Sequence, residues 1–160
     1  MNSKPTLFLD IDGVMVTTRQ HFEHMHPEYH ASYFDKKCVK VLNEILKKRR
    51  GSVIVLSSDW KLSYELPRME KIFTEFGITT MVTDITPDLW GVQFTSLKQL
   101  DECRATEILQ YVKEHELTNW VAIDDLNLFP WIPDNFVRCT HSTEGIKQSG
   151  VKDKILKILI

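Results

Sequence analysis

Three apolar segments of the chain each end in side chains that can do chemistry. Residues 6–9, 53–56 and 120–123 are almost continuously apolar, a pattern typical of strands buried on both faces of a parallel sheet. The polar residues that follow them are Asp10 and Asp12, Ser57 and Ser58, and Asp124 and Asp125. Because ligands of such sheets bind beyond the carboxyl ends of the strands, the pattern indicates one site built from all three segments.

Segments with the periodicity of amphipathic helices separate these strands. The sequence predicts helices around 39–46, over 64–76, from 101 onward and over 151–160, and shorter strands over 78–82 and 136–139. The histidine-rich and aromatic segment 17–36 and the segment 83–99 are predicted to be loops. Strands that alternate with helices imply right-handed crossovers. We therefore expect an α/β fold, a three-layer Rossmann-like parallel sheet with helices on both faces.

Length and charge narrow the picture further. At 160 residues the chain fits a single domain over 1–160, which is large enough to bury roughly 68–70% of its unfolded surface. The net charge of −2 gives no overall attraction to nucleic acid or to an anionic membrane. Any binding of a polyanion must therefore be local.

The cysteines and the apolar runs indicate a compartment. Cys38, Cys103 and Cys139 are widely spaced, odd in number and without C-x-x-C spacing, so they predict neither a disulfide framework nor a thiolate zinc site. No apolar run reaches 18 residues, and secretion or membrane spanning is not expected. We expect a cytoplasmic protein, and the sequence gives no sign of an obligate protein partner.

The first acidic pair is the most informative motif. Asp10 and Asp12 lie two residues apart at the end of a strand, where side chains at this spacing share a face, and Gly13 permits a sharp turn. Two carboxylates held within about 4 Å repel each other by roughly 4 kcal/mol at an effective dielectric constant near 20. A bound cation or a raised pKa must offset that cost. An ordinary strand followed by an Asp-Gly turn is the alternative interpretation of this motif alone.

In their order along the chain, these motifs resemble those of the haloacid dehalogenase (HAD) superfamily of phosphatases. Asp10-Ile11-Asp12-Gly13-Val14 is similar to the first motif, Ser57 to the second and Asp124-Asp125 to the fourth. The third motif is a lone cation near the start of a helix, for which Arg104 is our choice and Lys98 the competitor. Segments 53–61, 104–108 and 120–129 further resemble the small HAD domains of RNA-repair proteins and of polynucleotide 3′-phosphatases.

The resemblance implies a role for each residue. Asp10 would be the nucleophile and Asp12 the general acid and base, while Ser57 and Arg104 would bind the phosphoryl group. The resemblance also implies Mg²⁺, held by Asp10, by Asp12 through its backbone carbonyl, and by Asp124 and Asp125. Three further residues are candidates for substrate binding, namely Gly13, Ser58 and Lys98.

Simpler interpretations of these residues stay open at this point. Ser57 and Ser58 are also suited to capping the following turn, and Arg104 to an ion pair with Glu107 three residues on. The segment 17–36 can pack its aromatic residues onto the domain, stack on substrate bases, or bind a metal through its histidines. Three tryptophans are candidates for lining the cleft, namely Trp60, Trp90 and Trp131.

The sequence thus predicts a magnesium-dependent phosphomonoester hydrolase that acts through an aspartyl-phosphate. Only about twenty residues separate the first strand from the first helix, too few for a large cap domain, so we expect an open site. An open site suits a nucleic-acid end or a nucleotide, with a small phosphorylated metabolite as the alternative. A non-catalytic binding module is disfavoured because both Asp10 and Asp12 are present. A receiver domain is disfavoured because its phosphoacceptor aspartate lies on a later strand.

Overall fold

Five parallel strands form the central sheet of the computed structural model, which describes residues 3–89 and 95–160. In chain order these strands are β1 (Thr6–Leu9), β4 (Val53–Leu56), β5 (Val82–Ile85), β6 (Trp120–Asp124) and β7 (Phe136–Arg138). Their spatial order is β5-β4-β1-β6-β7, so β1 is central and β4 and β6 are its two neighbours. The predicted α/β fold class is confirmed.

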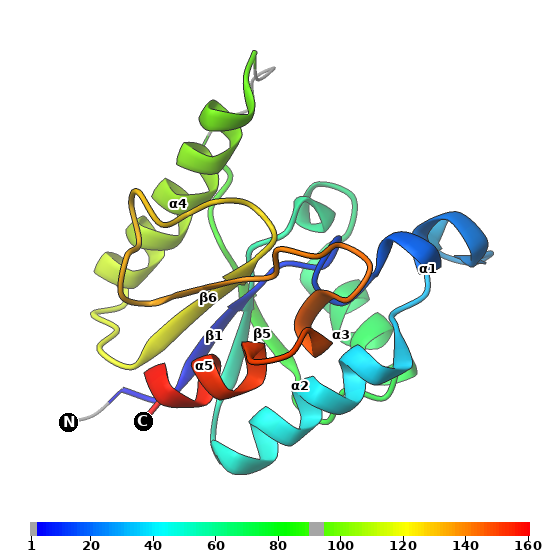
Figure 1. The fold of residues 1–160 in the computed structure, drawn as a ribbon, viewed down its shortest axis with the longest axis horizontal. Helices are drawn as coiled ribbons and strands as arrows, with labels where there is room; N and C mark the ends of the chain where they lie inside the picture. Colours follow the sequence, from blue (N-terminus) through cyan, green and yellow to red (C-terminus); the bar gives the residue numbers. More distant parts are fainter. Residues whose placement is uncertain (1–2, 90–94) are drawn as a thin grey trace.

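Helices cover both faces of this sheet. On one face lie α2 (Lys36–Lys48), α3 (Leu66–Glu75) and α5 (Val151–Ile158), and the long α4 (Leu97–Glu114) covers the other. Figure 1 shows α2 and α5 side by side, with α4 on the opposite side of the strands. The result is the predicted arrangement of three layers.

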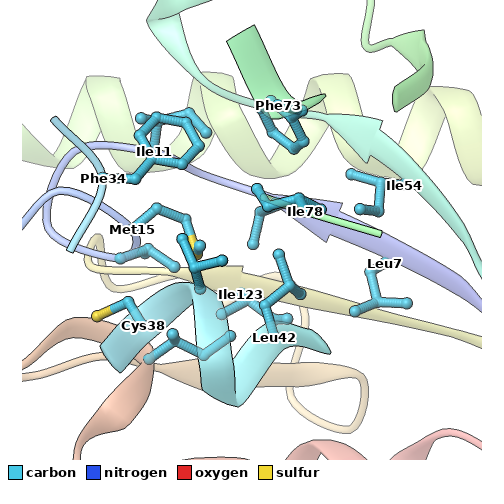
Figure 2. Packing of buried hydrophobic residues seen from close by; sticks show 14 of the residues in the cluster. Leu7, Ile11, Met15, Phe34, Cys38, Leu42, Ile54, Phe73, Ile78 and Ile123 are labelled. Carbon is cyan, nitrogen blue, oxygen red and sulfur yellow. The ribbon is translucent and has the colours of Figure 1, made fainter. Parts of the chain in front are cut away.

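Side chains of the central strand alternate between two apolar clusters. Leu7 and Leu9 of β1 point into a cluster shared with α2, α3 and α5, whereas Phe8 points into the cluster beneath α4. Figure 2 shows the first cluster, where Leu42 of α2 and Phe73 of α3 pack against the strands. The burial of both faces of β1 accounts for the apolar run Leu7–Leu9 in its sequence.

The segment 17–36 is not the loop that the sequence predicts. It contains a short helix, α1 (Thr18–Glu23), and a two-stranded antiparallel sheet of β2 (Met25–His26) and β3 (Ala31–Ser32). Strands of two residues carry no readable alternation, and six residues are less than two helical turns. Periodicity therefore could not reveal these elements.

The strand predicted over 78–82 is displaced to Val82–Ile85. Ile78 is buried, but it follows Gly77, whose φ of 85° ends α3, and its backbone N–H donates to the Phe73 carbonyl. This arrangement is the usual one for an apolar residue just beyond a helix C-cap. The apolar character of Ile78 therefore comes from the cap and not from the sheet.

Other boundaries shift by a few residues. The helix predicted over 64–76 is α3, which begins two residues later, at Leu66. A separate 3₁₀ helix, η1 (Asp59–Leu62), precedes it. Helix α4 begins at Leu97 and not at Asp101, because the Ser96 hydroxyl caps it by accepting from the Gln99 backbone N–H. A second 3₁₀ helix, η2 (Gly145–Lys147), precedes α5.

Among the residues that the structure describes, none form a large cap domain over the sheet, as the length of the segment 17–36 predicts. Within residues 3–89 and 95–160, no helix combines the length and apolarity that crossing a lipid bilayer requires.

Candidate active site

The three polar strand ends meet at the carboxyl edge of the sheet. Leu9 pairs in register with Leu56 of β4 on one side and with Ile123 of β6 on the other. The residues that follow these three in the chain are Asp10, Ser57 and Asp124. Because the strands are in register, these residues lie level with one another. This is the convergence that the apolar segments predict.

A tight turn follows Asp10. The Ile11 carbonyl accepts from the backbone N–H groups of Val14, Met15 and Val16, so the chain folds back on itself at once. Gly13 makes this possible with a φ of 82°, and a Cβ atom there would lie 2.5 Å from an Asp125 carboxylate oxygen. Gly13 thus allows the turn to lie directly against Asp125. The predicted contact of Gly13 with substrate stays a prediction.

Asp10, Asp124 and Asp125 form an acidic cluster. Each offers a carboxylate oxygen, and the three oxygens lie within 4.8 Å of one another. Burial, together with the charge of Asp124, raises the pKa of Asp10 well above its ordinary value and that of Asp125 to about 6. Three hard oxygen donors that disfavour one another's ionisation fit a hard divalent cation such as Mg²⁺. The carboxylate of Asp12 is not part of this cluster.

Arg104 supplies the positive charge of the site. Its buried guanidinium lies 3.2 Å from Asp10 Oδ1 and donates hydrogen bonds of 2.8 Å to Asp124 and to Asp59. These carboxylates raise the pKa of Arg104 despite its burial. The alternative ion pair with Glu107 is wrong. Lys98, the competitor, is an exposed residue in the first turn of α4.

The two serines have different surroundings. The Ser58 hydroxyl caps η1 by accepting from the Trp60 backbone N–H, as the simpler interpretation predicts, and Ser58 also lines the acidic cavity. The Ser57 hydroxyl is fully buried and has no hydrogen-bond partner among the described residues. A buried hydroxyl normally finds a partner, so the Ser57 hydroxyl is an unsatisfied polar group at the end of β4, although Ser57 does not line the acidic cavity.

Asp12 extends from the turn toward an aromatic group. Its side chain accepts a 3.0 Å hydrogen bond from the indole Nε1–H of Trp60. The Trp60 ring packs in turn against Phe34 and Tyr64, with ring centroids 5.7 and 5.6 Å away. Of the candidate tryptophans, Trp60 therefore reaches the site. Trp131 packs against the core beneath α4, and Trp90 lies outside the described residues.

Residues that the sequence analysis did not single out complete the surroundings. Asp59 holds the second arm of Arg104. Lys61 and Glu107 form an ion pair at 2.5 Å, with side chains only 4% and 5% exposed. Glu107 lies one helical turn after Arg104, so this pair fastens η1 to α4 beside the site. The sequence gives little indication of this buried pair, because lysine and glutamate are usually exposed.

The segment 17–36 packs mainly on the domain. Tyr29 and Phe34 are buried, and Phe34 stacks on Phe76 with centroids 4.5 Å apart. His26 stacks on Tyr29 and lies near Glu28 and Glu75. Nearby, Lys71 forms salt bridges with both of these glutamates. The interpretation of packing is thus confirmed for Tyr29 and Phe34, whereas Tyr33 is exposed.

A cavity of about 120 Å³ opens at the carboxyl edge. Its lining brings together the residues from the turn, η1, α4 and the loop after β6, namely Asp10, Asp12, Ser58, Asp59, Leu100, Arg104, Asp125 and Leu126. This volume suits a phosphoryl group with its immediate ligands and is well below that of most small-molecule sites. Anything larger must extend out of it.

A parallel sheet with this acidic pocket at its carboxyl edge and no large cap defines a small domain of the HAD superfamily. More narrowly, the chain belongs to the family described as the HAD domain in Swiss Army Knife RNA repair proteins, whose model matches residues 6–151. No curated protein and no solved structure matches the chain. Membership in this family supports a function of the HAD phosphatase type.

Proposed function

We propose that this domain is a cytoplasmic, magnesium-dependent phosphomonoester hydrolase that forms an aspartyl-phosphate on Asp10 and acts on phosphorylated nucleic-acid ends. One observation carries the proposal: the buried carboxylate of Asp10 meets Arg104 and Asp125 at a single phosphate-sized cavity, and the buried Asp124 completes the acidic cluster. The free thiols of all three cysteines suit a reducing compartment.

The reaction uses two carboxylates in turn. A carboxylate oxygen of Asp10 attacks phosphorus, and the ester oxygen leaves with a proton from Asp12. Water then attacks the phosphorus of the aspartyl-phosphate and gives its proton to Asp12, which releases inorganic phosphate and restores Asp10. The turn after β1 supports these separate roles, because Asp10 is buried and Asp12 is exposed.

Arg104 and Ser57 would hold the phosphoryl oxygens. The guanidinium already spans Asp10 and Asp124, so it needs little rearrangement to stabilise charge on phosphorus. The unpartnered Ser57 hydroxyl would donate to another oxygen. Asp10, Asp124 and Asp125 would hold Mg²⁺, and this ion would supply neutralising positive charge beside the phosphate.

Two observations support a nucleic-acid end as substrate. The family is one of HAD domains in RNA repair proteins, and the site has no large cap to enclose a small metabolite. A bulky phosphorylated end can therefore reach a cavity that itself accommodates little more than the phosphoryl group.

The test is hydrolysis by the purified protein of 3′-phosphorylated oligonucleotides, nucleotides and sugar phosphates, with Mg²⁺ or with EDTA. We expect release of phosphate that requires Mg²⁺, is fastest on an oligonucleotide, and is abolished by Asp10→Asn. The control is Asp134→Asn, an exposed residue just before β7 and so at the opposite edge of the sheet. Activity unchanged by Asp10→Asn would overturn the proposed mechanism. Preference for a sugar phosphate would overturn the assignment of a nucleic-acid end as the substrate.

A further inference from the structure

A second cavity lies beside the candidate active site. It has a volume of about 910 Å³ and is formed by α1, the start of α2, the end of α3 and the segment around η2. Sites for small ligands usually have volumes of about 300–1,000 Å³, whereas the acidic cavity has only about 120 Å³. The larger cavity therefore has room for parts of a substrate that the acidic cavity cannot contain.

The charge of its lining is positive. Four cationic and two anionic side chains line it, which gives a formal charge of +2 with His24 neutral. Lys147 is paired with Asp35 at 2.7 Å, and Arg19 with Glu23. The ammonium groups of Lys36 and Lys37 are exposed and form no ion pair within residues 3–89 and 95–160. Two cations are thus free to bind phosphate groups.

An exposed aromatic ring lies in the same cavity. Tyr33 is 39% exposed, and its ring packs against those of Phe76 and His26, with centroids 5.7 and 5.2 Å away. A supported ring that keeps a free surface is suited to stacking on a nucleobase. Cationic groups interleaved with such rings are the usual means of holding single-stranded nucleic acid.

This cavity is connected to the active site through two short links. Phe34 lines the cavity and packs on Trp60, whose indole donates to Asp12. Thr17 also lines it and directly follows Val16, the residue that bridges to Asp12 in the turn after β1. These contacts place the larger cavity close to Asp12, so a strand whose terminal phosphate is bound at Asp10 would need to extend only past the turn after β1 to reach it.

We propose that Lys36, Lys37 and Tyr33 form a subsite for single-stranded nucleic acid, which holds the part of the strand adjoining its phosphorylated end. The two lysines bind backbone phosphates, and Tyr33 stacks on a base. This inference rests on the proposed function, because it assigns the strand to the same active site. It also explains how a protein with a net charge of −2 binds a polyanion, since the positive charge is local.

The test measures binding apart from turnover. In the Asp10→Asn background with Mg²⁺, the dissociation constant of a fluorescently labelled 3′-phosphorylated single-stranded oligonucleotide is determined across a range of salt concentrations. We expect Lys36→Ala with Lys37→Ala to weaken binding by about tenfold or more. Each lost phosphate contact lowers the slope of log K against log salt by about 0.7 for single strands, so the slope should become shallower by about 1.4.

Matched variants separate this subsite from general charge and packing effects. Lys40→Ala with Lys47→Ala removes the same charge from exposed positions of α2 outside the cavity, and should leave both the affinity and the slope unchanged. Tyr33→Leu should weaken binding at least about fivefold without changing the slope, because stacking contributes about 1–3 kcal/mol per base. Tyr33→Phe keeps the ring and should bind normally.

Three results would overturn the subsite. Equal losses in the two lysine pairs would mean that only overall charge matters. Unchanged binding in the Lys36 and Lys37 pair would place the strand elsewhere. Displacement of the oligonucleotide by polyphosphate, with Tyr33→Leu binding normally, would show a site for anions and not for nucleic acid. The proposed function is judged separately, because hydrolysis of p-nitrophenyl phosphate by the wild-type protein with Mg²⁺ does not require the subsite.

Discussion

Ser57 and Ser58 are neighbours in the chain, but their hydroxyl groups have opposite surroundings. The Ser57 hydroxyl is buried and has no partner within the described residues, a situation that costs about 1–3 kcal/mol relative to a satisfied group. Ser58, next to it, does bond within the protein as the cap of η1. The two serines should therefore respond in opposite ways to replacement.

Ser57→Ala should keep or raise the free energy of unfolding, by up to about 1 kcal/mol, while lowering kcat/KM about 10²- to 10³-fold through the lost donor. Ser58→Ala should instead lower the free energy of unfolding by about 1 kcal/mol through the lost cap. Urea unfolding and phosphatase assays on both variants check this. A clear loss of stability in Ser57→Ala would mean that its hydroxyl has a partner after all.

The hydrogen bond from Trp60 to Asp12 is a second interaction on which catalysis should depend. Trp60→Phe removes the indole donor and keeps an aromatic ring against Phe34 and Tyr64. A less well oriented acid should slow the hydrolysis of alkyl phosphates about tenfold. Hydrolysis of p-nitrophenyl phosphate should change little, because its leaving group needs little protonation. Equal losses on both substrates would indicate general damage to the site.

At the scale of elements, η1 and α4 are joined by buried charges. Lys61 of η1 pairs with Glu107 of α4 and also donates to the Thr86 hydroxyl and the Pro87 carbonyl. One turn away, Asp59 of η1 pairs with Arg104 of α4. Arg104, which would bind phosphate, therefore lies on an element that these pairs hold in a fixed relation to η1, which begins two residues after Ser57.

Removing one partner of the buried pair should be costly. Lys61→Met leaves Glu107 without its cation, and we expect the free energy of unfolding to fall by about 3–5 kcal/mol. Replacing both, as in Lys61→Met with Glu107→Leu, should recover most of that loss, because no unpaired charge remains. Chemical denaturation of the two single variants and the double variant forms the cycle. Additive losses would show that the pair is not coupled.

The same elements show what the sequence could and could not predict. The three apolar strands and the polar residues after them were predictable, because burial on both faces and a polar strand end are both local patterns. Arg104, the residue chosen as the phosphate-binding cation, lies 3.2 Å from Asp10, but its partner Asp59 was missed. The Trp60 contact with Asp12 joins residues 48 positions apart. The periodicity of apolar residues carries no information about such a contact. It also could not reveal the short elements within 17–36.

For the whole molecule, the acidic cluster sets a balance between stability and metal binding. Burial and mutual repulsion raise the pKa values of Asp10 and Asp125, which means that their ionised forms destabilise the fold when no cation is bound. A divalent cation bound by the cluster would relieve this repulsion and would bind only the folded state. The protein should therefore be markedly more stable with Mg²⁺ than with EDTA.

This balance predicts opposite effects of one substitution. With EDTA at pH 7, Asp125→Asn should melt at a higher temperature than the wild type, because a repelling charge is gone. Saturation at about 100 times Kd stabilises a protein by about 2.7 kcal/mol, or about 5–10 °C at this size. Asp125→Asn should lose most of that Mg²⁺-induced rise, and Asp134→Asn should keep it. Thermal melts with EDTA or Mg²⁺ measure both effects, and an equal rise in all three proteins would contradict them.

The two ends of the described chain lie together, at the edge of the sheet away from the acidic cavity (Figure 1). Ser3 and Ile160 both bond to Asn119, which immediately precedes β6. A fluorescent label, an affinity handle or an immobilising tether attached at either end would thus stand clear of any substrate. A short linker could even join the ends in a circularly permuted variant, with new termini opened in an exposed surface turn.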